Sequence, residues 1–236
     1  MASIAAPTTV AVLGAGSYGT ALAFVAAAAG CKVMWFMRSE EQAKCINEKR
    51  SNPKRFSDQT VPEAVTASTS FEECVADAKV VLHAIPAQHT AKFLQTHGAK
   101  LKVGVPYVST AKGIAVATHQ MMSELIPAEL RKVRGIAFLD VPLAYLSGPS
   151  FAKEMIANHP VGVVVASTDL AVASAVKEIL GHSRFRVCGY QPLWYQRVPV
   201  VSLPLPRDAG REINHQSSHS LTTSPLARLS HFARLA

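Results

Sequence analysis

The sequence predicts an α/β fold in which a doubly wound, mostly parallel sheet carries helices on both faces. Apolar runs rich in β-forming residues alternate with helical segments from residue 9 to about residue 187. The first run leads through a glycine-rich turn into a helical segment and a second strand, all within about 30 residues, as in a βαβ unit. Of 236 residues, 49% are hydrophobic and 17% are charged, which excludes chain-wide disorder and provides for a buried core.

The first strand–helix–strand unit has clear boundaries. We expect a strand at Thr9–Leu13, then the glycine-rich turn, then an Ala/Leu-rich helix over Thr20–Ala29. Gly30 stands where a helix C-cap requires a glycine, and Lys32–Met37 has the composition of the next strand. This order predicts two neighbouring parallel strands joined by a helix.

The same alternation continues along the chain. Further strands are expected at Val65–Ala67, Lys79–Ile85, Pro106–Ser109, Leu143–Ser147, Val161–Ala166 and Phe185–Val187. Further helices are expected at about 39–50, Ser70–Ala76, 87–97, 117–125, 150–157 and Leu170–Leu180. This alternation predicts a doubly wound sheet with helices on both faces, and no internal repeat is visible.

Charge and composition divide the chain near residue 188. Residues 1–188 hold 12 lysines and 7 arginines against 14 acidic residues, a net charge of +5. Residues 189–236 hold 5 arginines, no lysine, 2 acidic residues and 5 prolines, with no periodicity. We therefore expect a folded domain over 1–188 and a divergent, poorly ordered tail over 189–236. Five dispersed arginines are a weak footprint for nucleic acid, so no nucleic-acid partner is expected.

The chain carries no sign of a membrane or secreted protein. No apolar run reaches the roughly 18–20 residues that a membrane span needs, and the first ten residues do not resemble a secretory signal. Four cysteines (Cys31, Cys45, Cys74 and Cys188) lack CxxC spacing. We expect reduced thiols and a cytoplasmic protein.

The glycine-rich turn has the spacing GxGxxG and the required context. Gly14 can form the tight turn, Gly16 lets the backbone approach a pyrophosphate, and Gly19 permits close packing of helix on strand. The start of the following helix offers unpaired N–H groups to phosphates. The pattern favours dinucleotide binding in a Rossmann-like fold; the alternative is a glycine turn without a ligand.

The choice between NAD and NADP depends on the end of the second strand. An acidic residue there would accept the ribose hydroxyls of NAD, but this chain has Arg38. An arginine can pair with a 2′-phosphate or stack on adenine, which favours NADP or use of both cofactors. Arg38 could instead be an ordinary surface residue, and Glu40 and Glu41 stand slightly late for the ribose role, so NAD stays open.

Four motifs together resemble one enzyme family. They are GAGSYGTALA from Gly14, AIPAQ at Ala84–Gln88, STAKGI at Ser109–Ile114 and LSGPSFAKE at Leu146–Glu154. In this order they resemble NAD(P)-dependent glycerol-3-phosphate dehydrogenase, and its bacterial-type form more than the animal cytosolic one. The resemblance covers residues 9 to about 188.

The resemblance implies hydride exchange between a nicotinamide and C2 of dihydroxyacetone phosphate or sn-glycerol 3-phosphate. It further implies that Ser17, Tyr18 and Arg38 contact the cofactor and that Lys112 contacts both cofactor and substrate. A cation at the carboxyl edge of the sheet suits a carbonyl or phosphate oxygen. Without the surrounding STAKG motif, Lys112 would be interpreted as an ordinary exposed loop lysine.

The LSGPSFAKE motif supplies the remaining implied contacts. Gly148 and Ser150 match substrate-contacting positions, and Ala152 matches one against the cofactor. Ser150 would also suit the cap of a helix beginning at Phe151. Pro86 and Phe93 are further candidates near the cofactor, although the helical spacing of Phe93 favours a core position. His83, in an apolar strand, is expected to be a hydrogen-bonded core residue, and no metal site is expected.

The resemblance ends near Arg186–Cys188. The family has an all-helical second domain that supplies a catalytic lysine, and this domain is expected to be missing here. No lysine follows Lys177, so no position is assigned as catalytic. We hypothesise that residues 189–236 arise from a frame change, a retained intron or a gene-model error, which sequencing of the transcript across the Val187 codon would test.

The leading interpretation is a glycerol-3-phosphate dehydrogenase by family, whose chain is incomplete and weakly active or inactive. Two other functions are alternatives to it. One is a non-catalytic NAD(P)-binding module or truncated isoform, and the other is a different reductase of the same fold. STAKG followed by LSGPSFAKE speaks against the second. The expected partner is a small phosphorylated substrate, and a homodimer is a further candidate assembly.

Overall fold

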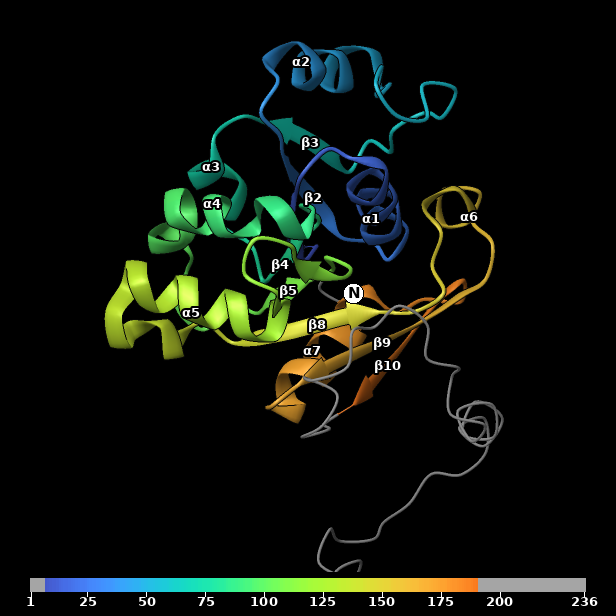
Figure 1. Ribbon diagram of the computed structural model, residues 1–236. Coiled ribbons are helices and arrows are strands. Elements are labelled where there is room, and N and C mark those ends of the chain that lie inside the picture. The colour runs from blue at the N-terminus through green and yellow to red at the C-terminus, as the bar shows by residue number, and fades with distance from the viewer. Residues whose placement is uncertain (1–6, 191–236) are drawn as a thin grey trace, which may run out of the picture. The chain divides into compact units, whose positions relative to one another are not determined.

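An eight-stranded sheet organises the computed structural model, which describes residues 7–190 (Figure 1). Its strand order is β10-β9-β8-β5-β4-β1-β2-β3. The strands are β1 (Thr9–Leu13), β2 (Lys32–Phe36), β3 (Val65–Ser68), β4 (Val80–His83), β5 (Tyr107–Ser109), β8 (Leu143–Ser147), β9 (Val161–Ser167) and β10 (Phe185–Tyr190). Neighbouring strands pair in parallel except β8 and β9, which are antiparallel. The mostly parallel α/β sheet predicted from the sequence is confirmed.

Helices cover both faces of the sheet. They are α1 (Ser17–Ala28), α2 (Glu40–Lys49), α3 (Phe71–Val75), α4 (Ala87–His97), α5 (Met122–Arg134), α6 (Ala152–Ile156) and α7 (Leu170–Leu180), with short 3₁₀ helices η1 (Gly98–Lys100) and η2 (Gly135–Asp140). Val10 and Val12 of β1 join the core that includes α1, α2, α6 and α7, whereas Ala11 and Leu13 join the core that includes α3, α4 and α5. Successive side chains of a strand point to opposite faces, so β1 is buried on both sides, as a doubly wound fold requires.

Helix α1 ends as its sequence predicts. Gly30 adopts φ +82, a left-handed conformation that suits glycine. Its N–H donates to Ala27 O and the N–H of Cys31 donates to Ala26 O, so the last turn is closed by backbone hydrogen bonds. The chain then turns directly into β2, which pairs in parallel with β1.

The region after β5 differs from the sequence prediction. The helix expected at 117–125 begins at Met122 and runs to Arg134, and a hairpin of β6 (Ile114–Ala115) and β7 (Gln120–Met121) precedes it. A turn explains the later start, because the N–H of His119 donates to Ala115 O and His119 adopts φ +54. Pro127 lies inside α5; burial of the helix's apolar face, including Ile126, outweighs the backbone bond that proline removes.

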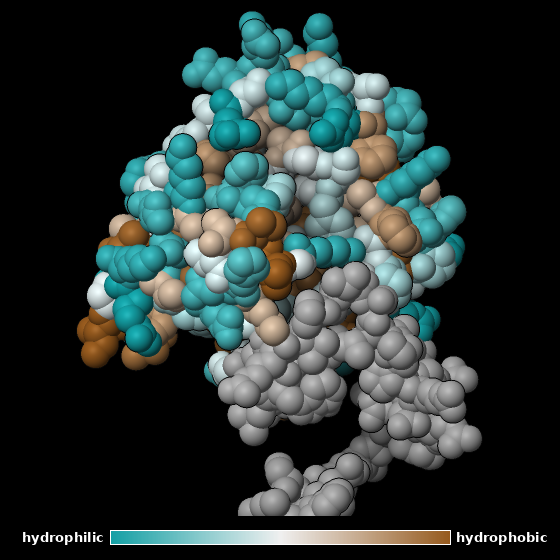
Figure 2. Space-filling view, viewed as in Figure 1, coloured by the Kyte–Doolittle hydropathy of each residue, from teal (hydrophilic) through white to brown (hydrophobic). Residues whose placement is uncertain are grey.

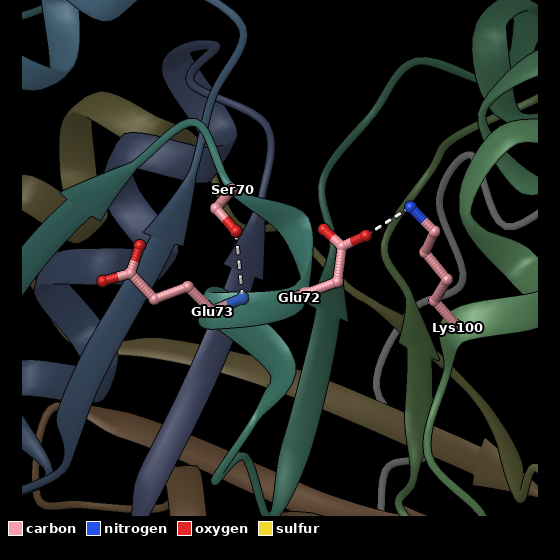
Figure 3. Close-up of polar contacts among 4 residues, drawn as sticks. All are labelled: Ser70, Glu72, Glu73 and Lys100. Carbon is pink, nitrogen blue, oxygen red and sulfur yellow. Dashed lines mark hydrogen bonds and ion pairs between the residues drawn. The ribbon is translucent and has the colours of Figure 1, made fainter.

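Helix α3 shows how the short connecting helices are held (Figure 3). The Ser70 hydroxyl accepts a hydrogen bond from the backbone N–H of Glu73 at 3.2 Å, which caps the helix start. The Glu72 carboxylate pairs with the Lys100 ammonium of η1, and this hydrogen bond lowers the pKa of Glu72. The pair joins α3 to η1 across the same face of the sheet.

Two sequence expectations concern the C-terminal part of the chain. The last strand was expected at Phe185–Val187 and continues to Tyr190. The tail expected over 189–236 lies, from residue 191 onward, outside the described residues. In the described part of the chain, every helix is too short or too polar to cross a membrane.

Candidate functional site

The carboxyl ends of four adjacent strands bring the sequence motifs to one edge of the sheet. The strands β1, β4, β5 and β8 lie side by side and parallel to one another (Figure 1). The loops that follow them contain GAGSYG, AIPAQ, STAKG and SGPSF in that order. Ligands of open α/β sheets bind outside the carboxyl ends of the strands, so this edge is the candidate site.

The three glycines of the fingerprint meet different steric demands. Gly14 adopts φ +107, and a Cβ there would lie 2.9 Å from Ala84 O. A Cβ on Gly19 would lie only 1.9 Å from Gly14 O, so helix α1 packs directly on the turn itself. A Cβ on Gly16 would have no neighbour within 4 Å. Gly14 and Gly19 are therefore needed by the fold, whereas Gly16 leaves open space at the helix start.

Backbone and indole hydrogen bonds fix the glycine turn. Trp35 of β2 is fully buried, and its Nε1–H donates to Gly14 O at 2.9 Å. The N–H of Gly14 donates to Phe36 O, and the N–H of Thr20 donates to Gly16 O. Sequence reasoning missed Trp35, although a tryptophan inside an apolar strand needs an acceptor for its indole N–H.

The turn fits a dinucleotide pyrophosphate. Helix α1 is 12 residues long and begins at Ser17, directly after Gly16, which has an extended conformation with φ −76 and ψ 178. The first N–H groups of a helix lack intrahelical partners and attract anions. Gly16 and Ser17 are both exposed, and the space around Gly16 lets a phosphate approach the backbone.

Tyr18, Lys112 and Ser150 come from three distant segments and meet beside the glycine turn. The Tyr18 hydroxyl and the Ser150 hydroxyl are 2.9 Å apart, and Ser150 is only 2% exposed. The Lys112 ammonium lies 5.6 Å from the centre of the Tyr18 ring, a cation–π distance. Burial raises the pKa of Tyr18, and the hydrogen bond with Ser150 opposes this shift. Tyr18 is therefore a neutral phenol that connects the glycine turn to the predicted substrate residues.

Ser150 does not cap a helix, contrary to the alternative derived from the sequence. Helix α6 begins at Ala152, and its N-cap residue is Phe151, so Ser150 lies one residue too early. The Ser150 hydroxyl instead donates to Gly148 O at 3.2 Å and bonds Tyr18. A Cβ on Gly148 would lie 2.7 Å from Gly162 O, so this position also requires glycine. Ser150 is thus oriented toward Tyr18 by its own loop.

The other predicted site residues have separate surroundings. Arg38 follows β2 and is exposed, and β2 ends at the same sheet edge as β1. Glu40 and Glu41 lie in the first turn of α2, where carboxylates stabilise the helix start. Ala152 is half-buried against the core that includes α1.

His83 is a core residue, as the sequence predicts. It is fully buried; its Nε2 lies 3.0 Å from the Thr90 hydroxyl and its Nδ1 lies 2.7 Å from the Tyr107 hydroxyl. Burial lowers its pKa to about 3, so the imidazole is neutral. Phe93 packs half-buried between His83 and Phe36. Both aromatic side chains pack in the hydrophobic core rather than in the candidate site.

Comparisons with known proteins agree with this geometry. The family model for the N-terminus of NAD-dependent glycerol-3-phosphate dehydrogenase matches residues 9–173. The chain is 38% identical over 180 residues to glycerol-3-phosphate dehydrogenase [NAD(+)] 2, chloroplastic, of Arabidopsis thaliana, covering 75% of this chain and 41% of that protein. It is 33% identical over 227 residues to glycerol-3-phosphate dehydrogenase [NAD(P)+] of Acinetobacter baumannii, covering 94% of this chain and 61% of that protein.

A solved structure gives the same result. The crystal structure of glycerol-3-phosphate dehydrogenase from Coxiella burnetii has a TM-score of 0.67 and 26% sequence identity, covering 78% of this chain and 54% of that one. The chain therefore spans about half the length of the relatives it matches, and the Acinetobacter alignment extends beyond residue 188. On the family match over residues 9–173 and the fold that carries it, the chain belongs to the NAD-dependent glycerol-3-phosphate dehydrogenase family.

Proposed function

We propose that the chain binds NADH or NADPH at the turn Gly14–Gly19 and serves the interconversion of sn-glycerol 3-phosphate and dihydroxyacetone phosphate. The observation that carries the proposal is the meeting of Tyr18, Lys112 and Ser150 beside this turn. Family membership supplies the reaction, and the sheet edge supplies a surface with a phosphate-binding helix start and a cation.

Each residue at the edge has a proposed role. The cofactor-binding residues are Gly14, Gly16, Ser17, Tyr18, Gly19, Arg38, Lys112 and Ala152, and the substrate-binding residues are Lys112, Gly148 and Ser150. A bound nicotinamide would supply the hydride to the substrate carbonyl or take one from the alcohol, and the accompanying proton would enter or leave at the substrate oxygen, for which no residue is assigned as donor or acceptor. The Lys112 ammonium is proposed to attract the substrate phosphate and to stabilise negative charge that develops on the carbonyl oxygen. The Ser150 hydroxyl, held by Tyr18, is proposed to orient the substrate.

A pair of measurements tests this proposal. NADH is titrated into the full chain while its fluorescence is followed, and dihydroxyacetone-phosphate-dependent NADH oxidation is measured in the same preparation. We expect Lys112→Met to weaken NADH binding and to abolish any substrate-dependent oxidation, because it removes the only proposed cation for the substrate. Lys153→Met, at an exposed position on α6, is the matched control and should bind NADH as the wild type does. A folded wild-type protein that binds neither NADH nor NADPH would overturn the proposal.

The same experiment separates an enzyme from a binding module. Saturable NADH binding without substrate-dependent oxidation would favour the non-catalytic alternative. Substrate-dependent oxidation by the purified chain would favour a complete catalytic unit. Because no position of this sequence is assigned as the proton donor, we expect binding with weak turnover.

We also propose a cytoplasmic protein of glycerol 3-phosphate metabolism. All four cysteines are free in the structure, and Cys31 and Cys74 are buried. Burial raises the pKa of both thiols, that of Cys74 to about 12, which keeps them protonated and unreactive. Free buried thiols suit a reducing compartment. Fractionation of cells that express the full chain with a tag tests the location.

A homodimer is proposed on the basis of exposed apolar surface. Val103, Ile136 and Leu139 are 66%, 85% and 67% exposed. The N–H of Gly104 donates to Asp140 O, which joins the loop of Val103 to the end of η2, the helix in which Ile136 and Leu139 lie. Figure 2 shows apolar surface at the α5 end of the molecule, on the lower left. Such surface favours association. Sedimentation of the wild type and of Ile136→Ser/Leu139→Ser tests the proposal; a monomeric wild type would exclude it.

A further inference from the structure

A series of buried hydrogen bonds leads from helix α2, through the loop that follows it, to the glycine turn. Its members are Gln42, Asn52 and Thr20, which are 5%, 0% and 1% exposed. Gln42 Nε2 donates to Asn52 Oδ1 at 2.7 Å, and Asn52 Nδ2 donates to Thr20 Oγ1 at 3.0 Å. Thr20 Oγ1 donates to Gly16 O at 3.0 Å. The series of hydrogen bonds therefore ends on the carbonyl of Gly16, the glycine at which a pyrophosphate is proposed to approach.

The direction of these bonds follows from the backbone. The N–H of Lys54 lies 3.2 Å from the amide of Asn52 and can only donate, so the Asn52 atom facing it is the oxygen Oδ1. The other end of the amide, Nδ2, then faces Thr20 and donates to its hydroxyl. Because a hydroxyl has one proton, the Thr20 hydroxyl that accepts from Asn52 directs this proton at Gly16 O.

The loop that carries Asn52 is itself held rigidly against the domain. The N–H of Val61 donates to Arg50 O at 2.7 Å, and Ser51 and Thr60 form an antiparallel bridge. The Arg50 guanidinium donates to Val65 O at 3.0 Å, which ties the loop to β3. In Figure 1 the segment after α2 passes beside α1. A closed loop of this kind presents the Asn52 amide in one orientation.

We propose that Asn52 is a positioning residue for the dinucleotide, acting through Thr20 on the carbonyl of Gly16. This inference rests on the proposed cofactor binding. Gly16 O accepts from both the N–H and the hydroxyl of Thr20, and this pair of bonds fixes the peptide that joins Gly16 to Ser17. The N–H of Ser17, the first of α1, belongs to that same peptide. Its direction toward a phosphate is therefore set before the cofactor arrives, which reduces the ordering cost of binding.

Three substitutions test the proposal, with Ser167→Ala as the control. Thr20→Val keeps the shape of the side chain and removes the hydroxyl, and we expect it to weaken NADH binding by about threefold to tenfold, the equivalent of one hydrogen bond. Thr20→Ser keeps the hydroxyl and should restore wild-type affinity. Asn52→Asp replaces the donor with an acceptor, draws the Thr20 proton away from Gly16 O, and should weaken binding at least as much as Thr20→Val. Ser167 also donates from a buried hydroxyl to a backbone carbonyl, Leu143 O, but at the opposite sheet edge, so Ser167→Ala should bind as the wild type does.

A second measurement separates positioning from a general loss of stability. Hydrogen exchange of the amide of residue 20, whose N–H donates to Gly16 O at 2.9 Å, is compared with that of β9 in the cofactor-free protein. Faster exchange of this amide in Thr20→Val and Asn52→Asp, with β9 unchanged, is the expected result. If the wild type binds NADH and Thr20→Val binds equally well, the positioning role is wrong while the proposed function stands. A wild type that does not bind NADH overturns both.

Discussion

Gly16 and Gly19 belong to the same fingerprint, yet the structure predicts opposite consequences when each is replaced by alanine. A Cβ at position 16 meets no atom within 4 Å, and the backbone there has φ −76, which alanine adopts readily. Gly16→Ala loses the small preference for glycine over alanine before a helix and gains from a less flexible unfolded chain. These two effects on stability are each about 1 kcal/mol or less and have opposite signs. The free energy of unfolding should therefore change by less than about 1 kcal/mol.

At position 19 the added methyl group would lie 1.9 Å from Gly14 O, well inside van der Waals contact. The helix must move off the turn, and overpacking of this kind costs about 1–3 kcal/mol. In a domain of this size each kcal/mol lowers Tm by about 2–4 °C. Gly19→Ala should therefore lose stability clearly, and its cofactor affinity should fall as a consequence of that movement.

The assay measures urea unfolding and NADH titration on the wild type and both variants. Gly16→Ala should unfold like the wild type but bind NADH about tenfold more weakly or worse, because its methyl group occupies the space left for the pyrophosphate; a tenfold change corresponds to about 1.4 kcal/mol. Gly16→Val, with a larger side chain, should bind still more weakly. Undiminished NADH binding by folded Gly16→Val would refute the assignment of the open space to the cofactor.

Three further predictions concern separate parts of the domain. Burial lowers the pKa of His83 to about 3, against about 6.5 in an unfolded chain, so only the unfolded state gains a proton as pH falls below about 6.5. The contribution of His83 to the free energy of unfolding is therefore complete above pH 6.5 and decreases by up to about 1.4 kcal/mol per pH unit between about pH 6 and 3. In urea unfolding at pH 7 and pH 5, His83→Gln should lose less stability between the two pH values than the wild type does. An equal loss in both proteins would contradict this prediction. Ser70→Ala removes the cap bond to the N–H of Glu73 and should cost about 1 kcal/mol, seen as a lower urea midpoint with an unchanged m value; an unshifted midpoint would count against the cap. Arg38→Ala should weaken NADPH binding about tenfold or more while leaving NADH binding nearly unchanged, and equal losses for both cofactors would argue against a 2′-phosphate contact.

Much of the fold could be predicted because local sequence and tertiary context agree. In the strand Thr9–Leu13 the last four residues are all apolar and buried, and the helix after it is followed by Gly30, which adopts a left-handed conformation. The helix expected at 117–125 was misplaced because a two-strand hairpin and a proline inside α5 depend on contacts that periodicity does not reveal. The antiparallel pairing of β9 with β8 could not be assigned from the order of elements alone.

The candidate site was predictable only in part. The motifs identified Tyr18, Lys112 and Ser150 separately, and the parallel order of β1, β5 and β8 explains why they meet. The hydrogen bond between Tyr18 and Ser150 joins residues 132 positions apart, and no local pattern indicates it. Asn52 was also missed, since a polar residue in a loop normally reads as solvent-exposed, whereas here it is fully buried.

Titration calorimetry of the full chain with NADH tests the central claim most directly. The account predicts saturable binding at one site per chain, with a lower affinity for Gly16→Ala, whose free energy of unfolding should change by less than about 1 kcal/mol. Absence of saturable heat in a wild-type protein that unfolds cooperatively, with NADH and with NADPH alike, would contradict the assignment of the Gly14–Gly19 turn as a cofactor site.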